Sequence, residues 1–112
     1  MQMAYTKQVA ISTTVEATSA VDPMLLCGFG GTYPAAGAAA LGVFADSAAT
    51  GDSVAVDLGI IPVEAGGAIT AGAEVQAGTN GKVIAKAAGI VVGRALDTAT
   101  ADGDIIRIKI FG

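Results

Sequence analysis

The sequence contains no histidine and no tryptophan, and its only cysteine is Cys27. Without histidine the chain cannot build a Ser-His-Asp triad, a Cys-His dyad or a histidine-ligated metal site. A lone cysteine cannot form a disulfide within the chain, so the fold has to hold without such cross-links. We therefore expect a protein that is not an enzyme and that has no metal site and no cofactor.

Charge is also scarce and unbalanced. The 112 residues include 6 lysines and arginines against 10 aspartates and glutamates, which gives a net charge of −4. An acidic surface opposes binding to a phosphate backbone, so nucleic acid is not an expected partner. The uncharged run of residues 23–45 could span a bilayer by length, but prolines and glycines interrupt it and aspartates flank it. We expect no membrane partner.

Small and β-branched side chains dominate what is present. Glycine and alanine account for 16 and 24 residues, and the 11 valines and 10 isoleucines far outnumber the 5 leucines. β-Branched residues favour the pleated surface of a strand over the crowded turn of a helix. The composition predicts a single all-β domain with a thin core, for which oligomerisation would add burial.

An internal repeat organises most of the chain. Residues 41–48 recur as residues 92–99, and Gly51-Asp52 recurs as Gly103-Asp104 after one inserted residue. Apolar residues at every second position after each Gly-Asp pair indicate strands. Two similar halves, about 24–58 and 75–110, predict a pseudo-symmetric small β-barrel or sandwich of the β-clip or β-tulip type within one domain, residues 21–112.

Residues 1–20 are interpreted as an extended N-terminal arm outside this repeat. They lack glycine and proline, and they lack the basic and apolar parts of an export signal, which predicts synthesis in the cytoplasm. Val9, Ile11, Thr13 and Val15 are predicted to share one face of a strand. Such an arm either packs on its own domain or adds to an edge of a partner, and both alternatives stay open.

The acidic and Asn-Gly positions are interpreted as turn residues. Asp46 and Asp97 recur at one turn position, and Asp52 and Asp104 recur where the next strand begins. Asp side chains at such places bond nearby backbone amides, and the spacing, with Asp102 included, lacks the ligand pattern of a calcium loop. Asn80-Gly81 predicts a tight hairpin turn.

Three further motifs are candidate sites. Residues 28–31 are rich in glycine, but no Lys-Ser or Lys-Thr follows them, which argues against a phosphate-binding loop. Cys27 lies beside two leucines and is expected to be a buried apolar residue rather than a nucleophile. Lys82 and Lys86 are the candidates if the chain is instead a biotinyl-like or lipoyl-like carrier module, or a related small-molecule-binding β domain.

The order of motifs in residues 59–112 resembles a known family. The stretch begins Gly-Ile-Ile-Pro-Val-Glu-Ala-Gly-Gly-Ala-Ile, continues with Asn-Gly-Lys-Val, and ends Val-Gly-Arg-Ala-Leu-Asp-Thr-Ala-Thr-Ala-Asp-Gly-Asp-Ile-Ile-Arg-Ile. It resembles the capsid cement, or head decoration, proteins of tailed bacteriophages. With residues 41–58 the resemblance covers about two thirds of the chain.

The resemblance implies an all-β structural protein of the virion with no catalytic residues. It implies a homotrimer on the outer face of the capsid, bound to the major capsid protein and stabilising the shell against internal DNA pressure. Before assembly such a protein would be in the host cytoplasm. Val9, Ile11, Thr13 and Val15 of the arm are the residues we expect to contribute to docking.

Overall fold

The computed structural model describes residues 8–110, which form an all-β protein without an α-helix. This confirms the predicted fold class. The eight strands run along the chain as β1 (Gln8–Glu16), β2 (Leu26–Cys27), β3 (Gly42–Phe44), β4 (Ser53–Glu64), β5 (Glu74–Ala77), β6 (Val83–Ala85), β7 (Val91–Ala95) and β8 (Ile105–Ile110). One short 3-10 segment, η1 (Thr79–Gly81), joins β5 to β6.

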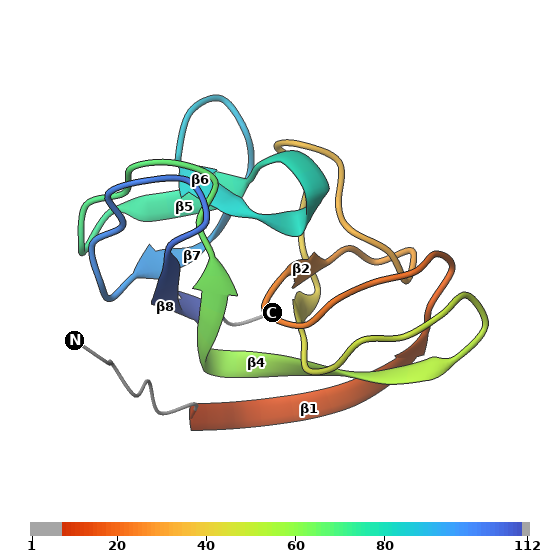
Figure 1. Cartoon of the computed structure of the whole chain (residues 1–112). Coiled ribbons are helices and arrows are strands. Elements are labelled where there is room, and N and C mark those ends of the chain that lie inside the picture. The colour runs from red at the N-terminus through yellow and green to blue at the C-terminus, as the bar shows by residue number, and fades with distance from the viewer. Residues whose placement is uncertain (1–7, 111–112) are drawn as a thin grey trace.

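The strands form one strongly curved sheet (Figure 1). Neighbouring strands follow the order β2-β3-β4-β8-β7-β5-β6, and β1 pairs with β4 outside this path. All the named strand pairs are antiparallel. The long strand β4 therefore connects the two halves, because its first part pairs with β1 and β3 while its second part pairs with β8.

The repeat begins earlier in the chain than the sequence analysis places it. β1 lies against β4 as β4 lies against β8, with Val15 opposite Val54 and Val63 opposite Ile106. The backbone N–H of Ala17 donates to Asp52 at 2.8 Å, and that of Ala65 donates to Asp104 at 2.7 Å. The prediction that residues 1–20 fall outside the repeat is thus wrong for the end of β1.

A short sequence match marks this part of the repeat. Residues 15–17 and 63–65 both read Val-Glu-Ala, at an offset of 48 rather than 51 residues. The offset changes because the loops between β2 and β3 and between β5 and β7 differ in length. A search at one fixed offset therefore finds only the later strands of each half.

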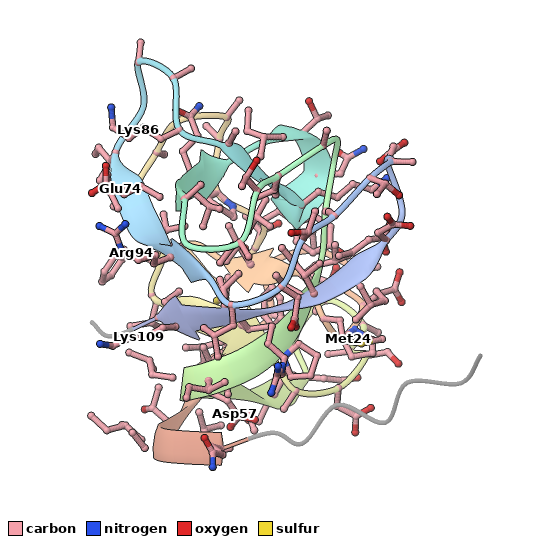
Figure 2. All side chains as sticks on the ribbon, turned by 90° about the vertical axis from the view of Figure 1, so that its left-hand side faces the viewer. Met24, Asp57, Glu74, Lys86, Arg94 and Lys109 are labelled. Atoms are coloured by element: carbon pink, nitrogen blue, oxygen red, sulfur yellow. The ribbon has the colours of Figure 1, made fainter. Side chains whose placement is uncertain are left out.

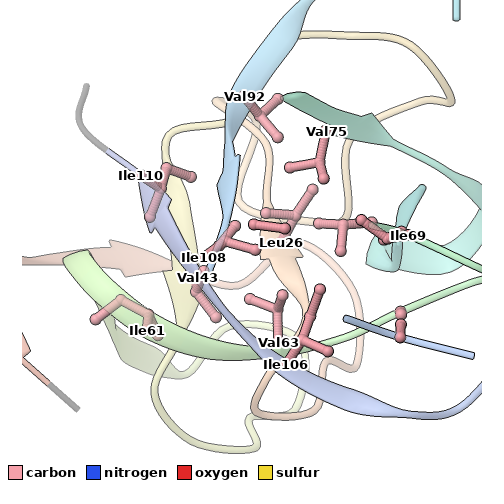
Figure 3. Close-up of a cluster of buried hydrophobic side chains, with 14 of the residues drawn as sticks. Leu26, Val43, Ile61, Val63, Ile69, Val75, Val92, Ile106, Ile108 and Ile110 are labelled. Atoms are coloured by element: carbon pink, nitrogen blue, oxygen red, sulfur yellow. The ribbon is translucent and has the colours of Figure 1, made fainter. Parts of the chain in front are cut away.

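Buried side chains form two clusters, one for each half. The first-half cluster contains Ala17, Val21, Cys27, Phe44, Val54 and Val56. The larger cluster contains their second-half counterparts and is also filled by Leu26 and Val43 from the first half (Figure 3). The two halves therefore share one of their cores.

Two further findings apply to residues 8–110. No helix in this part is long and apolar enough to cross a membrane. No group of three cysteine, aspartate or glutamate residues in it is arranged to hold a metal ion.

Candidate docking surface

Strand β1 packs on its own domain through β4, along a register that runs from Gln8 opposite Ile60 to Glu16 opposite Ser53. The pairing shifts between Val9 and Ile11, where Ala10 is the extra residue of a β-bulge. Gly59 makes the close approach possible, because its φ is +135° and a Cβ there would lie 2.2 Å from the carbonyl oxygen of Gln8. Of the two alternatives left open for the arm, the described residues adopt the first.

The bulge changes which side chains share a face. On β1, the residues opposite Leu58, Val56 and Val54 are Ile11, Thr13 and Val15. These three side chains therefore point to the side of the sheet that carries the first-half cluster, which we call the core side of β1. Val9 lies opposite Gly59, on the other side of the register shift. The prediction of one face for all four residues is therefore wrong for Val9, because an inserted residue interrupts the period of two.

The core-side face of β1 is largely uncovered. Ile11 is 60% exposed, Thr13 is exposed and Val15 is half-buried. The counterparts of Thr13 and Val15 in the second half of β4 are Ile61 and Val63, which are buried in the larger cluster. Positions of β1 that are exposed in the first half therefore correspond to positions of β4 that are buried in the second half. This makes the exposed face of β1 a candidate docking surface.

The recurring aspartates lie at turns and accept hydrogen bonds from nearby groups. Asp46 Oδ1 accepts from the N–H of Ser47 at 2.8 Å. Asp52 Oδ2 accepts from the N–H of Ala49 at 3.1 Å, and Asp104 Oδ2 accepts from the equivalent Ala101 at 3.2 Å.

Asp104 and Asp97 make additional bonds that Asp52 and Asp46 do not make within residues 8–110. Asp104 Oδ2 also accepts from the backbone N–H of Thr100 at 2.8 Å, and these amide donors hold the pKa of Asp104 below its ordinary value. Asp97 accepts from Arg107 Nε and Nη2, both at 2.9 Å, and this guanidinium lowers the pKa of Asp97. The Asp97 bonds tie its turn to β8, whereas the Asp104 bonds close the turn that precedes β8.

Asn80 and Gly81 form the turn between β5 and β6. Asn80 has φ 57° and ψ 38°, Gly81 has φ +77°, and the N–H of Lys82 donates to Thr79 at 3.3 Å. Positive φ at both central positions is the geometry of a type I′ turn. Lys82 lies between this turn and the first residue of β6.

The two candidate carrier lysines are both engaged. Lys82 Nζ lies 2.9 Å from Asp102 and 3.2 Å from Glu64, and these carboxylates raise the pKa of Lys82. Lys86 Nζ donates to the carbonyl of Ala87 at 2.8 Å. The Lys82 side chain therefore lies against the protein surface in two ion pairs and does not extend into solvent from the tip of a hairpin.

Cys27 is fully buried in the first-half cluster. Its thiol donates to the carbonyl of Gly28 at 3.1 Å, and burial raises its pKa to about 11. A thiol with such a pKa holds almost no thiolate at neutral pH, which makes it a poor nucleophile.

A second surface was missed by the sequence analysis. Residues of β5, β7 and β8 line an open groove, where Arg94 Nη2 lies 3.6 Å from Glu74 Oε2. The groove is lined by Glu74, Val91, Val92, Gly93, Arg94 and Lys109. The repeat carries a signal for it, because the counterparts of Glu74 and Arg94 are the buried residues Leu26 and Val43.

The sequence matches a known protein family over nearly its whole length. The model of the phage cement protein family matches residues 5–110. The chain belongs to the phage cement protein family. It is therefore a structural protein of the phage virion, as the resemblance predicted.

A solved structure shows the same fold. The head fiber gp8.5 N base of bacteriophage phi29 superposes with a TM-score of 0.74 and 24% sequence identity, covering 90% of this chain and 93% of that chain. No curated protein matches the sequence. The cement family thus shares its fold with a component of a phage head fiber.

Proposed function

We propose that this cement protein binds the outer surface of the capsid, contacts the major capsid protein, and stabilises the shell against the pressure of the packaged DNA. The observation that carries the proposal is the family match over residues 5–110. The protein would be a homotrimer on the capsid exterior, and it would be in the host cytoplasm before assembly. Partners that bind only the folded form would stabilise its thin cores by mass action.

The uncovered face of β1 is the proposed docking element. Ile11 and Thr13 are exposed on the side that carries the core, on a strand already fixed by β4. A fixed strand loses little conformational entropy when a partner covers it, which favours binding. Val15 sits at the inner end of this face, where it packs against the first-half cluster. Val9 lies across the bulge and is the remaining predicted arm contact.

Co-sedimentation with undecorated capsids tests the proposal. We expect the full-length protein to pellet with capsids, and decorated capsids to lose DNA at a higher temperature than undecorated ones. Failure to pellet at saturating concentration would contradict capsid binding. An unchanged temperature of DNA release would contradict the stabilising role.

Point variants test the face of β1 better than deletion of the arm. Deletion through residue 18 would remove Ala17, which is buried and bonded to Asp52. We expect the Ile11→Glu, Thr13→Glu variant to lose most of its capsid binding, because both changes charge the docking face. The Ser12→Glu, Thr14→Glu variant adds the same charge on the opposite face of β1 and should bind as the unaltered protein does. Equal binding by both variants would reject this face as the docking element.

A further inference from the structure

Acidic residues gather without basic partners around the turn between β3 and β4. This acidic edge consists of Glu16, Asp22, Asp46 and Asp52, all exposed. Backbone hydrogen bonds from Ala17 to Asp52 and between Val21 and Ala48 hold these segments together. Within residues 8–110 no lysine or arginine forms an ion pair with any of the four.

Basic residues gather on a different part of the molecule. Lys86, Arg94 and Lys109 lie along one side of the protein together with Glu74 (Figure 2). We call these four residues the cationic strip. Glu74, Arg94 and Lys109 line the groove of β5, β7 and β8, beside Val91, which is 40% exposed. The backbone N–H of Lys86 donates to the carbonyl of Glu74 at 3.0 Å, which places Lys86 next to the groove. A strip with three positive charges and one negative charge stands out on a protein whose net charge is −4.

Neither surface follows from the repeat. The second-half turns carry acidic residues too, but Lys82 pairs with Glu64 and Asp102, and Arg107 pairs with Asp97. The first-half positions that match Arg94 and Lys109 are Val43 and Asp57, which are buried. Uncompensated negative charge thus belongs to the first half, and the exposed positive strip belongs to the second half.

We propose that the cationic strip of one copy binds the acidic edge of a second copy, so that the protein self-associates head to tail. The partner is chosen by charge complementarity, because the chain itself carries the surface that the strip would attract. Two different patches on one chain make a heterologous contact, which closes into a ring when the rotation permits. Contacts between two strips or two edges are opposed by like charges.

The two surfaces are placed so that one copy can contact two neighbours. The turn of residues 46–52 lies at the right of Figure 1, whereas β7 and β8 lie at the left. The inference rests on the self-association within the proposed function, and it does not depend on capsid binding.

Solution mass of the full-length protein, measured across salt concentration, tests the inference. We expect oligomers at low ionic strength that dissociate as the Debye length falls from about 30 Å at 0.01 M salt to about 3 Å at 1 M salt. The Lys86→Glu, Arg94→Glu variant should weaken self-association at least about tenfold, and so should Glu16→Lys, Asp22→Lys. Adding Asp46→Lys to these four changes gives the edge three positive charges and one negative charge, and it leaves the strip with three negative charges and one positive charge. This five-change variant exchanges the signs of the two surfaces and should recover self-association.

Controls separate charge from folding. Asp102→Lys reverses an exposed acid away from the acidic edge and should leave the mass unchanged. Because the Arg94 guanidinium donates to Gly72 at 2.6 Å, Lys86→Glu alone serves as the milder strip variant. Thermal unfolding of each variant shows whether the fold is retained.

Distinct results overturn the inference and the proposed function. A monomer at low salt and millimolar concentration overturns the inference, as does a five-change variant that stays monomeric. Strip variants that keep their oligomeric mass but lose capsid binding would assign the strip to the capsid and overturn the inference. Salt-sensitive oligomers that never bind capsids would sustain the inference and overturn the proposed function.

Discussion

Phe44 in the first half and Ala95 in the second half occupy the same place in the repeat, opposite Val56 and Ile108. Phe44 contacts Tyr33 edge to face, with ring centroids 5.9 Å apart. Among residues 8–110, the cluster around Ala95 has no aromatic member and instead includes Leu26 and Val43 from the first half. The first-half core thus contains aromatic side chains of its own half, whereas the second-half core also contains aliphatic side chains that come from the first half.

The burial of Leu26 and Val43 also explains why the surface at these positions differs between the two halves. Leu26 and Val43 are buried because residues of the second half pack over them. Within residues 8–110 no further repeat packs over their counterparts Glu74 and Arg94. A terminal repeat needs a polar outer face where the next repeat would stack. The same backbone arrangement can therefore end either in an apolar contact or in a charged surface.

Replacing the first-half aromatic should give the largest effect. Phe44→Ala removes a fully buried ring and leaves a cavity beside Tyr33, so we expect it to lower the free energy of unfolding by about 4 kcal/mol. Urea unfolding followed by circular dichroism measures this. Phe29→Ala is the matched control, because Phe29 is 71% exposed and its removal should change little. A loss below about 1 kcal/mol for Phe44→Ala would contradict a self-contained first-half core.

Leu26→Ala tests the sharing of the second core. The side chain belongs to a first-half strand but packs in the larger cluster, so we expect a loss of about 3 kcal/mol in the free energy of unfolding. Amide hydrogen exchange should show faster opening of β7 and β8, and the exposed counterpart Glu74→Ala should leave both unchanged. Faster exchange confined to β1 and β3 would show that Leu26 supports only its own half.

Part of this comparison could be predicted from the sequence. The Gly-Asp pairs and the alternating apolar residues identify β4 and β8, because these signals are local. Gly42 and Gly93 recur for a physical reason, since a Cβ would lie 2.7 Å from the Asp57 carbonyl oxygen and 2.4 Å from that of Lys109. Both glycines allow a strand to approach its neighbour closely.

The remaining features depend on contacts between distant residues. The bulge at Ala10 depends on Gly59, which lies about half a chain away, so a period-two pattern placed Val9 on the wrong face. The docking face of β1 is defined by what fails to cover it, and exposure of this kind is not encoded in residues 8–16 alone. The cationic strip joins residues of β5, β7 and β8 with Lys86, which follows β6, and only the sheet topology brings these segments together.

Asp97→Asn probes an ion pair that has no counterpart in the described part of the first half. Asp97 is bonded to Arg107 with its pKa lowered, so its stabilising effect is present above the unfolded pKa of about 3.9 and is lost as pH falls through the lower folded pKa. We expect Asp97→Asn to lower the free energy of unfolding by about 1 kcal/mol at pH 7. Unfolding curves measured from pH 7 to pH 2 should show this difference shrinking below about pH 4.

The first-half counterpart is the control for this ion pair. Asp46 accepts one bond from the adjacent Ser47, and within residues 8–110 no cation pairs with it. Asp46→Asn should therefore cost less at pH 7 than Asp97→Asn. Equal losses that are independent of pH would show that the Arg107 pair adds nothing to the second half.

The smallest expected difference is between the two Gly-Asp turns. The Asp104 side chain accepts from the backbone amides of Thr100 and Ala101 and from the Thr100 hydroxyl, whereas within residues 8–110 the Asp52 side chain accepts from Ala49 alone. Asp104→Ala should lower the urea midpoint more than Asp52→Ala, because it leaves more donors without their charged acceptor. The reverse order would mean that the first-half turn depends more on its aspartate, although both turns also bond through their backbones to Ala17 or Ala65. In that case the extra bonds of Asp104 would orient the turn without stabilising it.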